Sequence, residues 1–217
     1  MSTFLSIPRI DGLEVISPES VIEVLARHSV EKAVIGCDNW HWSDRNPSVS
    51  VRAAHSSDKL YLHFHVEDNE IRAEVGEDDG RVWEDSCCEF FVSPDSNGSY
   101  YNFECNCIGT LLLHYGTVGD RPAAPAEAFR AVERWSSLGD TPFGTESRVQ
   151  SWDLVEIIPA SALFRHDIKD LSGLEMTANF YKCGDLLPHP HFLSWAPISL
   201  EKPMFHCPQF FGKIKFE

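Results

Sequence analysis

The stretch from Trp83 to Phe91, Trp-Glu-Asp-Ser-Cys-Cys-Glu-Phe-Phe, decides the fold that this sequence predicts. It begins with a loop aromatic and acidic turn-forming residues, and then takes the alternating pattern of a β-strand. The alternation places Cys88 and Phe90 on one face of the strand and Glu89 on the other. A carboxylate in a strand of apolar and aromatic residues must be solvated, paired or in contact with a ligand, because burying an unpaired charge costs too much free energy. Trp83 supplies a flat apolar surface near that carboxylate.

A second alternating stretch, Tyr101–Cys107, is the expected hairpin partner of this strand. If the two strands pair with their cysteines and phenylalanines inward, Glu89 lies on the same face as Asn102, Glu104 and Asn106. Directly opposed residues on adjacent strands have Cβ atoms ~4.5 to 5.5 Å apart, so we expect Glu89 and Glu104 to be neighbours on a polar surface.

Alternating stretches recur along the chain at close spacing. We expect further strands at Glu31–Ile35, Val49–Ala53, Leu60–Val66, Leu111–Tyr115, Ala128–Trp135, Ser147–Ile158, Leu174–Lys182 and Gly212–Phe216. Helical signals are limited to residues 17–28 and one turn at residues 161–164, and the acidic segment 67–80 is expected to be a loop. This pattern indicates an all-β protein, an antiparallel β-sandwich that is jelly-roll-like, with one or two short helices. We expect a single domain over residues 1–217, with a lead-in at 1–48 and the core sandwich at 49–217.

The charge balance limits the partners that this chain can have. Eighteen Lys and Arg against 33 Asp and Glu give a net charge of −15 over 217 residues, which disfavours nucleic acid and anionic membrane surfaces as partners. The sequence contains no apolar run of the ~18 residues that a membrane span requires, and it does not begin with a signal peptide. We therefore expect a monomer that is cytoplasmic as the sequence stands, and secreted if the true start lies upstream.

The seven cysteines occupy mainly core-facing strand positions and lack zinc-ligand spacing, which indicates reduced, packed thiols. The pair His63 and His65, or the pair His189 and His191, could bind a metal ion, but solvated or hydrogen-bonded histidines are the simpler interpretation. We assign no metal ligands and no cofactor. A structural calcium ion is possible at the acidic segments 68–70 and 77–79, because hard cations prefer clustered oxygen ligands.

The polar face of the hairpin suits a neutral polyol. Carboxylates and amides bond its hydroxyl groups, at about 1.5 to 3 kcal/mol for each bond to a charged group. The apolar C–H faces of the same polyol pack on flat aromatic rings, such as that of Trp83.

Together with other stretches of the chain, this hairpin resembles carbohydrate-binding module family 9. The resemblance rests on the stretch Trp83–Phe91, on Tyr101-Asn102-Phe103 with Asn106 and Gly109, on Leu193-Ser194-Trp195, and on Phe211-Gly212-Lys213-Ile214. It covers most of the chain from about Val49 to the C-terminus. Membership implies a non-catalytic β-sandwich that clamps a terminal sugar between two tryptophans, with a Glu and an Arg bonding the hydroxyls and with structural calcium.

The resemblance also implies roles for individual residues. Trp83 corresponds to the first clamp aromatic and Glu89 to the sugar-binding glutamate. Phe205 stands where the family has its second clamp tryptophan. Glu104, on the strand that carries Asn106, stands where the family has its arginine, and so it reverses the charge at a ligand-contacting position.

A further polar contact of the family falls on the strand that carries Asn179 and Tyr181, and the sequence leaves open which of them matches. The expected saccharide-binding residues are thus Trp83, Glu89, Glu104, Asn106, Tyr181 and Phe205, and the expected ligand is a mono- or oligosaccharide.

Two other functions remain open from the sequence. Glu89 and Glu104 could form the carboxylate pair of a glycoside hydrolase, in which proximity raises the pKa of one of them and makes it the acid. Alternatively, the aromatic loop Trp40–Trp42 could dock another protein, without any sugar binding.

Overall fold

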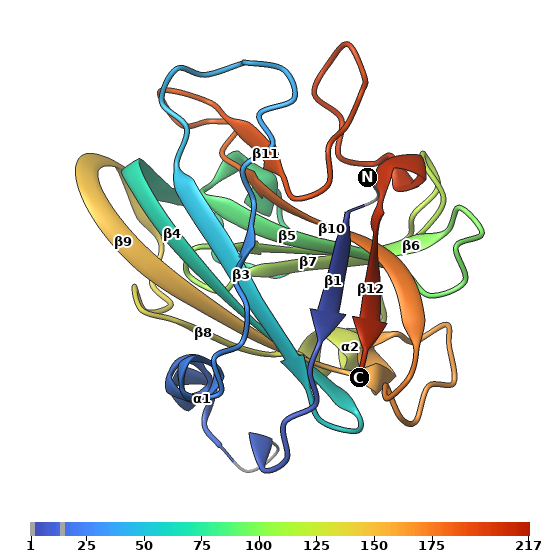
Figure 1. The fold of residues 1–217 in the computed structure, drawn as a ribbon. Helices are drawn as coiled ribbons and strands as arrows, with labels where there is room; N and C mark the ends of the chain where they lie inside the picture. Colours follow the sequence, from blue (N-terminus) through green and yellow to red (C-terminus); the bar gives the residue numbers. More distant parts are fainter. Residues whose placement is uncertain (1–2, 14–15) are drawn as a thin grey trace.

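The computed structural model of the protein describes residues 3–13 and 16–217, except for the side chains of residues 148 and 149. Within these residues the strands form two sheets, which lie as two layers in Figure 1. The expected all-β sandwich is therefore confirmed.

The first sheet has seven strands. Its order is β1 (Phe4–Ile7), β12 (Gly212–Phe216), β10 (Glu175–Cys183), β5 (Cys87–Ser93), β6 (Tyr100–Asn106) and β7 (Leu111–Gly116), with β11 (Phe192–Ser194) paired beside the end of β10. All of its pairs are antiparallel except that of β1 with β12.

The second sheet has five strands. Its order is β2 (Ala33–Val34), β3 (Ser48–His55), β4 (Lys59–Ala73), β9 (Phe143–Pro159) and β8 (Glu133–Ser136), all antiparallel. Helix α1 (Val21–Arg27), preceded by the 3-10 turn Pro18–Ser20, lies outside this sheet (Figure 1). It buries Val21 and Leu25 against Tyr61 and Val155 of the sheet.

The pairing of β5 with β6 is the one expected from the alternation. Glu89 stands opposite Glu104 and Cys88 opposite Cys105. On the inner face, Phe90 stacks on Phe180 of β10 with ring centroids 5.0 Å apart. The inner face of this sheet is thus apolar and aromatic, and the polar residues of β5 and β6 are left on its outer face.

Two expectations about local structure are wrong. Strand β4 continues through the acidic residues to Ala73, because Asp68 accepts the backbone N–H groups of residues 69 and 70 at an irregularity of the ladder, and Glu70 bonds His189. The expected strand Ala128–Trp135 instead begins as helix α2 (Ala126–Ala131) and becomes strand only in β8.

The lead-in at 1–48 contributes an edge strand to each sheet, although its positions 1–2 and 14–15 lie outside the described residues. The remaining short elements are the 3-10 turns Val82–Glu84, Ala160–Ala162 and Pro208–Phe210.

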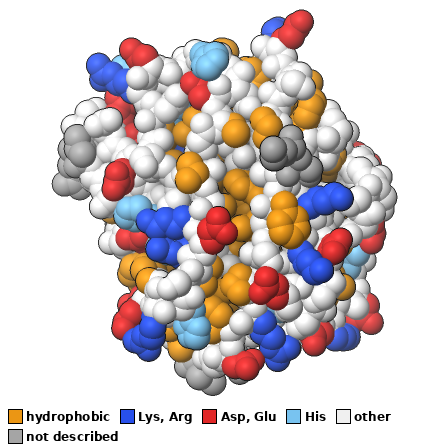
Figure 2. Space-filling view, in the orientation of Figure 1, with side chains coloured by type: hydrophobic (Ala, Val, Ile, Leu, Met, Phe, Trp, Pro, Cys, Tyr) orange, Lys and Arg blue, Asp and Glu red, His pale blue; other side chains and the backbone are white. Residues whose placement is uncertain are grey.

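The state of the cysteines and the charged surface are those expected from the sequence. All seven cysteines are free thiols. On the face shown in Figure 2, charged side chains of both signs are interspersed with apolar ones. Among the described residues, no helix is long and apolar enough to cross a membrane.

Candidate functional site

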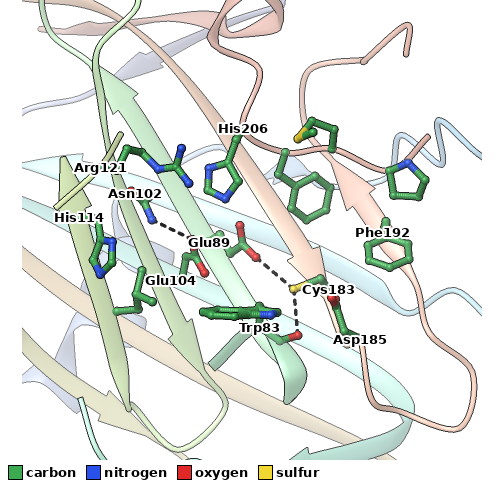
Figure 3. A pocket seen from close by; sticks show the side chains of 14 residues that line it. Trp83, Glu89, Asn102, Glu104, His114, Arg121, Cys183, Asp185, Phe192 and His206 are labelled. Carbon is green, nitrogen blue, oxygen red and sulfur yellow. Dashed lines mark hydrogen bonds between the residues drawn. The ribbon is translucent and has the colours of Figure 1, made fainter. Parts of the chain in front are cut away.

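A cavity of about 400 Å³ opens on the outer face of the seven-stranded sheet. Figure 3 shows Glu89 and Glu104 in its middle, with Trp83 along one side and with Arg121 and His206 on the opposite side. The floor is therefore the polar face of the β5–β6 hairpin, and loops from other parts of the chain supply the walls.

The first wall is Trp83, in the 3-10 turn Val82–Glu84. Its carbonyl oxygen accepts the backbone N–H of Asp185 at 3.1 Å, and the Arg81 guanidinium lies 5.6 Å from the centre of its ring. The fully buried Asp85 fixes the turn, because its carboxylate accepts the backbone N–H groups of residues 74 and 75 and the side-chain amide of Asn106. The turn that carries the indole is thus held on one side by the loop at Asp185 and on the other by residues 74 and 75.

The second wall is Phe205, in the loop that precedes the last strand. Its ring stacks on the buried ring of Tyr181, with centroids 4.2 Å apart and an interplanar angle of 13°. The Tyr181 hydroxyl also donates to the Phe205 carbonyl oxygen at 3.1 Å. Phe205 is therefore supported from below, and the cavity lies beside it.

The two glutamates on the floor are almost completely buried, with 2% and 4% of their surface exposed. The Cys183 thiol donates to Glu89 Oε1 at 3.0 Å, and Asn102 Nδ2 donates to Glu104 Oε1 at 2.9 Å. Burial raises the pKa of Glu89 well above its usual range, and the charges of Cys183 and Glu104 raise it further. Burial likewise raises the pKa of Glu104 to about 7, against the lowering effects of Asn102 and Arg121. At neutral pH this floor therefore carries less negative charge than two ordinary carboxylates would.

Arg121 is the cation of the cavity, and it comes from the connection between β7 and α2. Its guanidinium lies 5.4 Å from the centre of the Tyr100 ring. Arg121 Nε and Asn102 Oδ1 are buried and have no hydrogen-bond partner in the described part of the chain. A donor and an acceptor beside the cavity are thus left for an ordered water or a ligand to complete.

His206 and Asp185 complete the polar lining. The Tyr100 hydroxyl and His206 Nδ1 are 2.9 Å apart, and the imidazole stacks on Phe91. Burial lowers the pKa of His206 to about 3, with Arg121 and His114 adding to the effect, so this imidazole is neutral. Burial, together with the charge of Glu84, raises the pKa of Asp185 to about 6.

Comparisons with known proteins assign the chain that forms this cavity to a family. The model of carbohydrate-binding family 9 matches residues 19–216. The chain belongs to carbohydrate-binding family 9. The resemblance noted in the sequence is thereby confirmed, and it extends upstream of the point where the sequence alone placed it.

Solved structures support the assignment. A putative carbohydrate-binding protein from Bacteroides uniformis is 46% identical over 100% of both chains, with a TM-score of 0.96. A family 9 module from Caldicellulosiruptor kristjanssonii in complex with glucose has a TM-score of 0.66 at 12% identity, over 99% of this chain and 95% of that one. The cellotriose complex of such a module from the same organism has a TM-score of 0.63 at 12% identity, over 99% and 93%. These last two show a shared fold. A comparison with curated proteins gave no match.

Four of the six residues expected from the family 9 pattern line the cavity together, namely Trp83, Glu89, Glu104 and Phe205. Tyr181 does not line it, because its ring is completely buried beneath Phe205.

Asn106 does not line the cavity either. Its amide nitrogen donates to Val75 O at 2.8 Å and to Asp85 Oδ2 at 3.0 Å, and its oxygen accepts two backbone N–H groups. It fixes the loop that carries Trp83. Asn179, the alternative to Tyr181, is likewise buried and bonds the backbone of Ala196.

Sequence reasoning missed Arg121, His114, Asp185, Phe192 and His206, which also line the cavity. None belongs to the quoted motif, and all five lie outside the two strands that carry the carboxylates. The arginine is the informative case. Glu104 reverses the charge expected at its own position, yet Arg121 brings a guanidinium to the same cavity from 17 residues further along the chain. The one usable signal was its place just after strand β7.

Among the residues that the structure describes, two groups of side chains could offer a metal ion three ligand atoms within 4.8 Å of one another. They are His63, His65 and Asp153 on the outer face of the five-stranded sheet, and Cys87, Glu89 and Cys183 at the floor of the cavity. In the first group both imidazoles bond the same oxygen, Asp153 Oδ1, at 2.7 and 2.8 Å.

The acidic calcium candidates have other partners. Glu70 bonds His189, Asp78 bonds Arg134, and Asp79 bonds His114. Asp68 Oδ2 is buried and has no hydrogen-bond partner among residues 3–13 and 16–217. Structural calcium therefore stays a prediction.

Proposed function

We propose that the cavity binds a mono- or oligosaccharide and leaves it unchanged. One sugar ring lies between Trp83 and Phe205, which pack on its C–H faces. Its hydroxyl groups bond the polar floor of Glu89 and Glu104, with Arg121 as an additional donor. The observation that carries the proposal is the placement of two buried carboxyl groups between two aromatic walls that other side chains hold in position.

The chemistry of the floor supports this function. A carboxyl group with a raised pKa can donate as well as accept a hydrogen bond, and a sugar hydroxyl does both. The family supports it too, since the related modules named above were solved with glucose and with cellotriose.

The pKa directions favour binding over hydrolysis. A glycosidase needs one carboxylic acid together with one ionised carboxylate beside the scissile bond. Here burial raises the pKa of both glutamates, and among the described residues no neighbouring cation holds either pKa in or below its usual range, as the ionised partner would require. Membership of a carbohydrate-binding family is consistent with this interpretation.

The test is calorimetric titration with a panel of mono- and oligosaccharides. A small ligand at about −0.4 kcal/mol per non-hydrogen atom binds with about −5 kcal/mol, so the dissociation constant should be on the order of 0.1 to 1 mM. Trp83→Ala should abolish measurable binding while the circular dichroism spectrum persists.

Trp135→Ala is the matched control, because Trp135 is a half-buried tryptophan of β8 in the other sheet. Equal binding by the parent and Trp83→Ala would refute the clamp. Release of reducing ends from any oligosaccharide of the panel would refute the non-catalytic assignment.

A further inference from the structure

A row of aromatic rings leads from the wall of the cavity to the surface. Phe205 meets Phe192 at a centroid distance of 6.2 Å, and Phe192, which also lines the cavity, meets Trp42 at 5.7 Å. Trp42 stands edge-on to Phe192, at 85°. It is 57% exposed, which is unusual for so large an apolar side chain. A line of aromatic rings therefore runs from the edge of the cavity to the exposed Trp42.

The loop that carries Trp42 is held in place. The Asp38 carboxylate accepts the backbone N–H of His41 and the side-chain amide of Asn46, each at 2.9 Å. Trp40 turns inward, where its indole N–H donates to Leu200 O at 2.8 Å and its ring packs near Phe205. The two tryptophans thus have different roles. Trp40 anchors the loop, and Trp42 is left outside on an ordered support.

We propose that Trp42 forms a second saccharide subsite, which takes the sugar unit next to the one held between Trp83 and Phe205. This inference rests on the proposed function. A cavity of about 400 Å³ is near the lower end of small-molecule sites, so a ligand longer than one or two sugar units extends beyond it. On the side of Phe192, the first flat apolar surface that an extending ligand meets is the indole of Trp42.

The occupant is a sugar ring rather than a protein. A stable protein interface buries about 800 Å² on each partner, with a cluster of anchoring residues. Of the two tryptophans in this loop, Trp42 is the one that remains exposed, since the indole of Trp40 is bonded to Leu200. One exposed indole matches one sugar ring.

The test compares the chain-length dependence of affinity in the parent and in Trp42→Ala, using the mono-, di- and trisaccharides of one series that binds. For the parent we expect the affinity to rise about fivefold from monosaccharide to disaccharide, as one added aromatic contact provides. In Trp42→Ala the monosaccharide affinity should be unchanged and the rise should disappear. Trp42→Tyr should retain most of it.

Val34→Ala is the control, since Val34 is also exposed but lies on edge strand β2 of the other sheet. An equal rise in the parent and Trp42→Ala, or no rise in the parent, would overturn the subsite and leave the pocket intact. Failure of the parent to bind even the monosaccharide would instead refute the proposed function, and the subsite with it.

Discussion

Replacing Glu156 by Gln should stabilise the protein at alkaline pH. Glu156 lies on β9 with its side chain in the core between the sheets, and it is completely buried. Neither of its carboxyl oxygens has a hydrogen-bond partner in the described part of the chain. Burial raises its pKa from 4.5 to about 8, although the charge of Arg134 lowers it. The folded protein therefore holds this proton over a pH range in which the unfolded chain has released it.

The sign of the effect follows from this difference. A carboxyl group with a raised pKa in the folded state leaves stability intact below about pH 4.5 and reduces it as the pH rises through about 8. A shift of this size corresponds to at most about 5 kcal/mol, and water entering the core lowers it, so we expect about 3 kcal/mol at pH 9. Glutamine cannot ionise, so Glu156→Gln should lack this loss.

Urea unfolding at pH 5, 7 and 9 measures the effect. With a slope of about 2.5 kcal/mol per molar urea, the midpoint of Glu156→Gln should exceed that of the parent by about 1 M at pH 9 and should nearly equal it at pH 5. Glu201→Gln, which changes an exposed carboxylate, is the control. Parallel pH dependence of the parent and Glu156→Gln would refute the reasoning.

Three further predictions concern the cavity. Arg121→Met should raise the pKa of Glu104 above about 7, since the guanidinium lowers it; a carbon NMR titration measures this, and an unchanged pKa would contradict it. Phe205→Ala should weaken saccharide binding about 5- to 30-fold in calorimetry, whereas Phe210→Ala, outside the cavity, should not. Asp85→Ala should lower the melting temperature by roughly 10 °C, because the partners of this buried carboxylate lose their acceptor; a shift below 2 °C would contradict its role.

The sandwich could be predicted because its central strands follow a simple pattern. In β5 and β6, every second residue is apolar, and the observed register turns Cys88, Phe90, Phe103 and Cys105 inward together while Glu89 and Glu104 face outward. The pattern failed where charged residues are buried with specific partners. Asp68 and Glu70 belong to a strand because Asp68 Oδ1 accepts backbone N–H groups and Glu70 bonds His189, and these partners are distant in the sequence or are not side chains.

The site could be predicted only where the family motif carries it. Trp83 and Glu89 lie six residues apart, so local spacing places them together. Arg121 and His206 reach the same cavity from separate loops, and nothing in their local sequence shows where those loops fold. Tyr181 is the opposite case, because the sequence predicts it as a lining residue and the structure buries it beneath Phe205. Its strand was assigned correctly, but whether its ring meets the ligand or supports Phe205 depends on how a distant loop covers it.

The most direct test of the account is a crystal structure of the protein with the saccharide that binds best in the panel. We predict electron density for a sugar ring between Trp83 and Phe205, with its hydroxyl groups within hydrogen-bond distance of Glu89 and Glu104. A saccharide bound elsewhere on the molecule, with this cavity holding only water, would contradict the central claim.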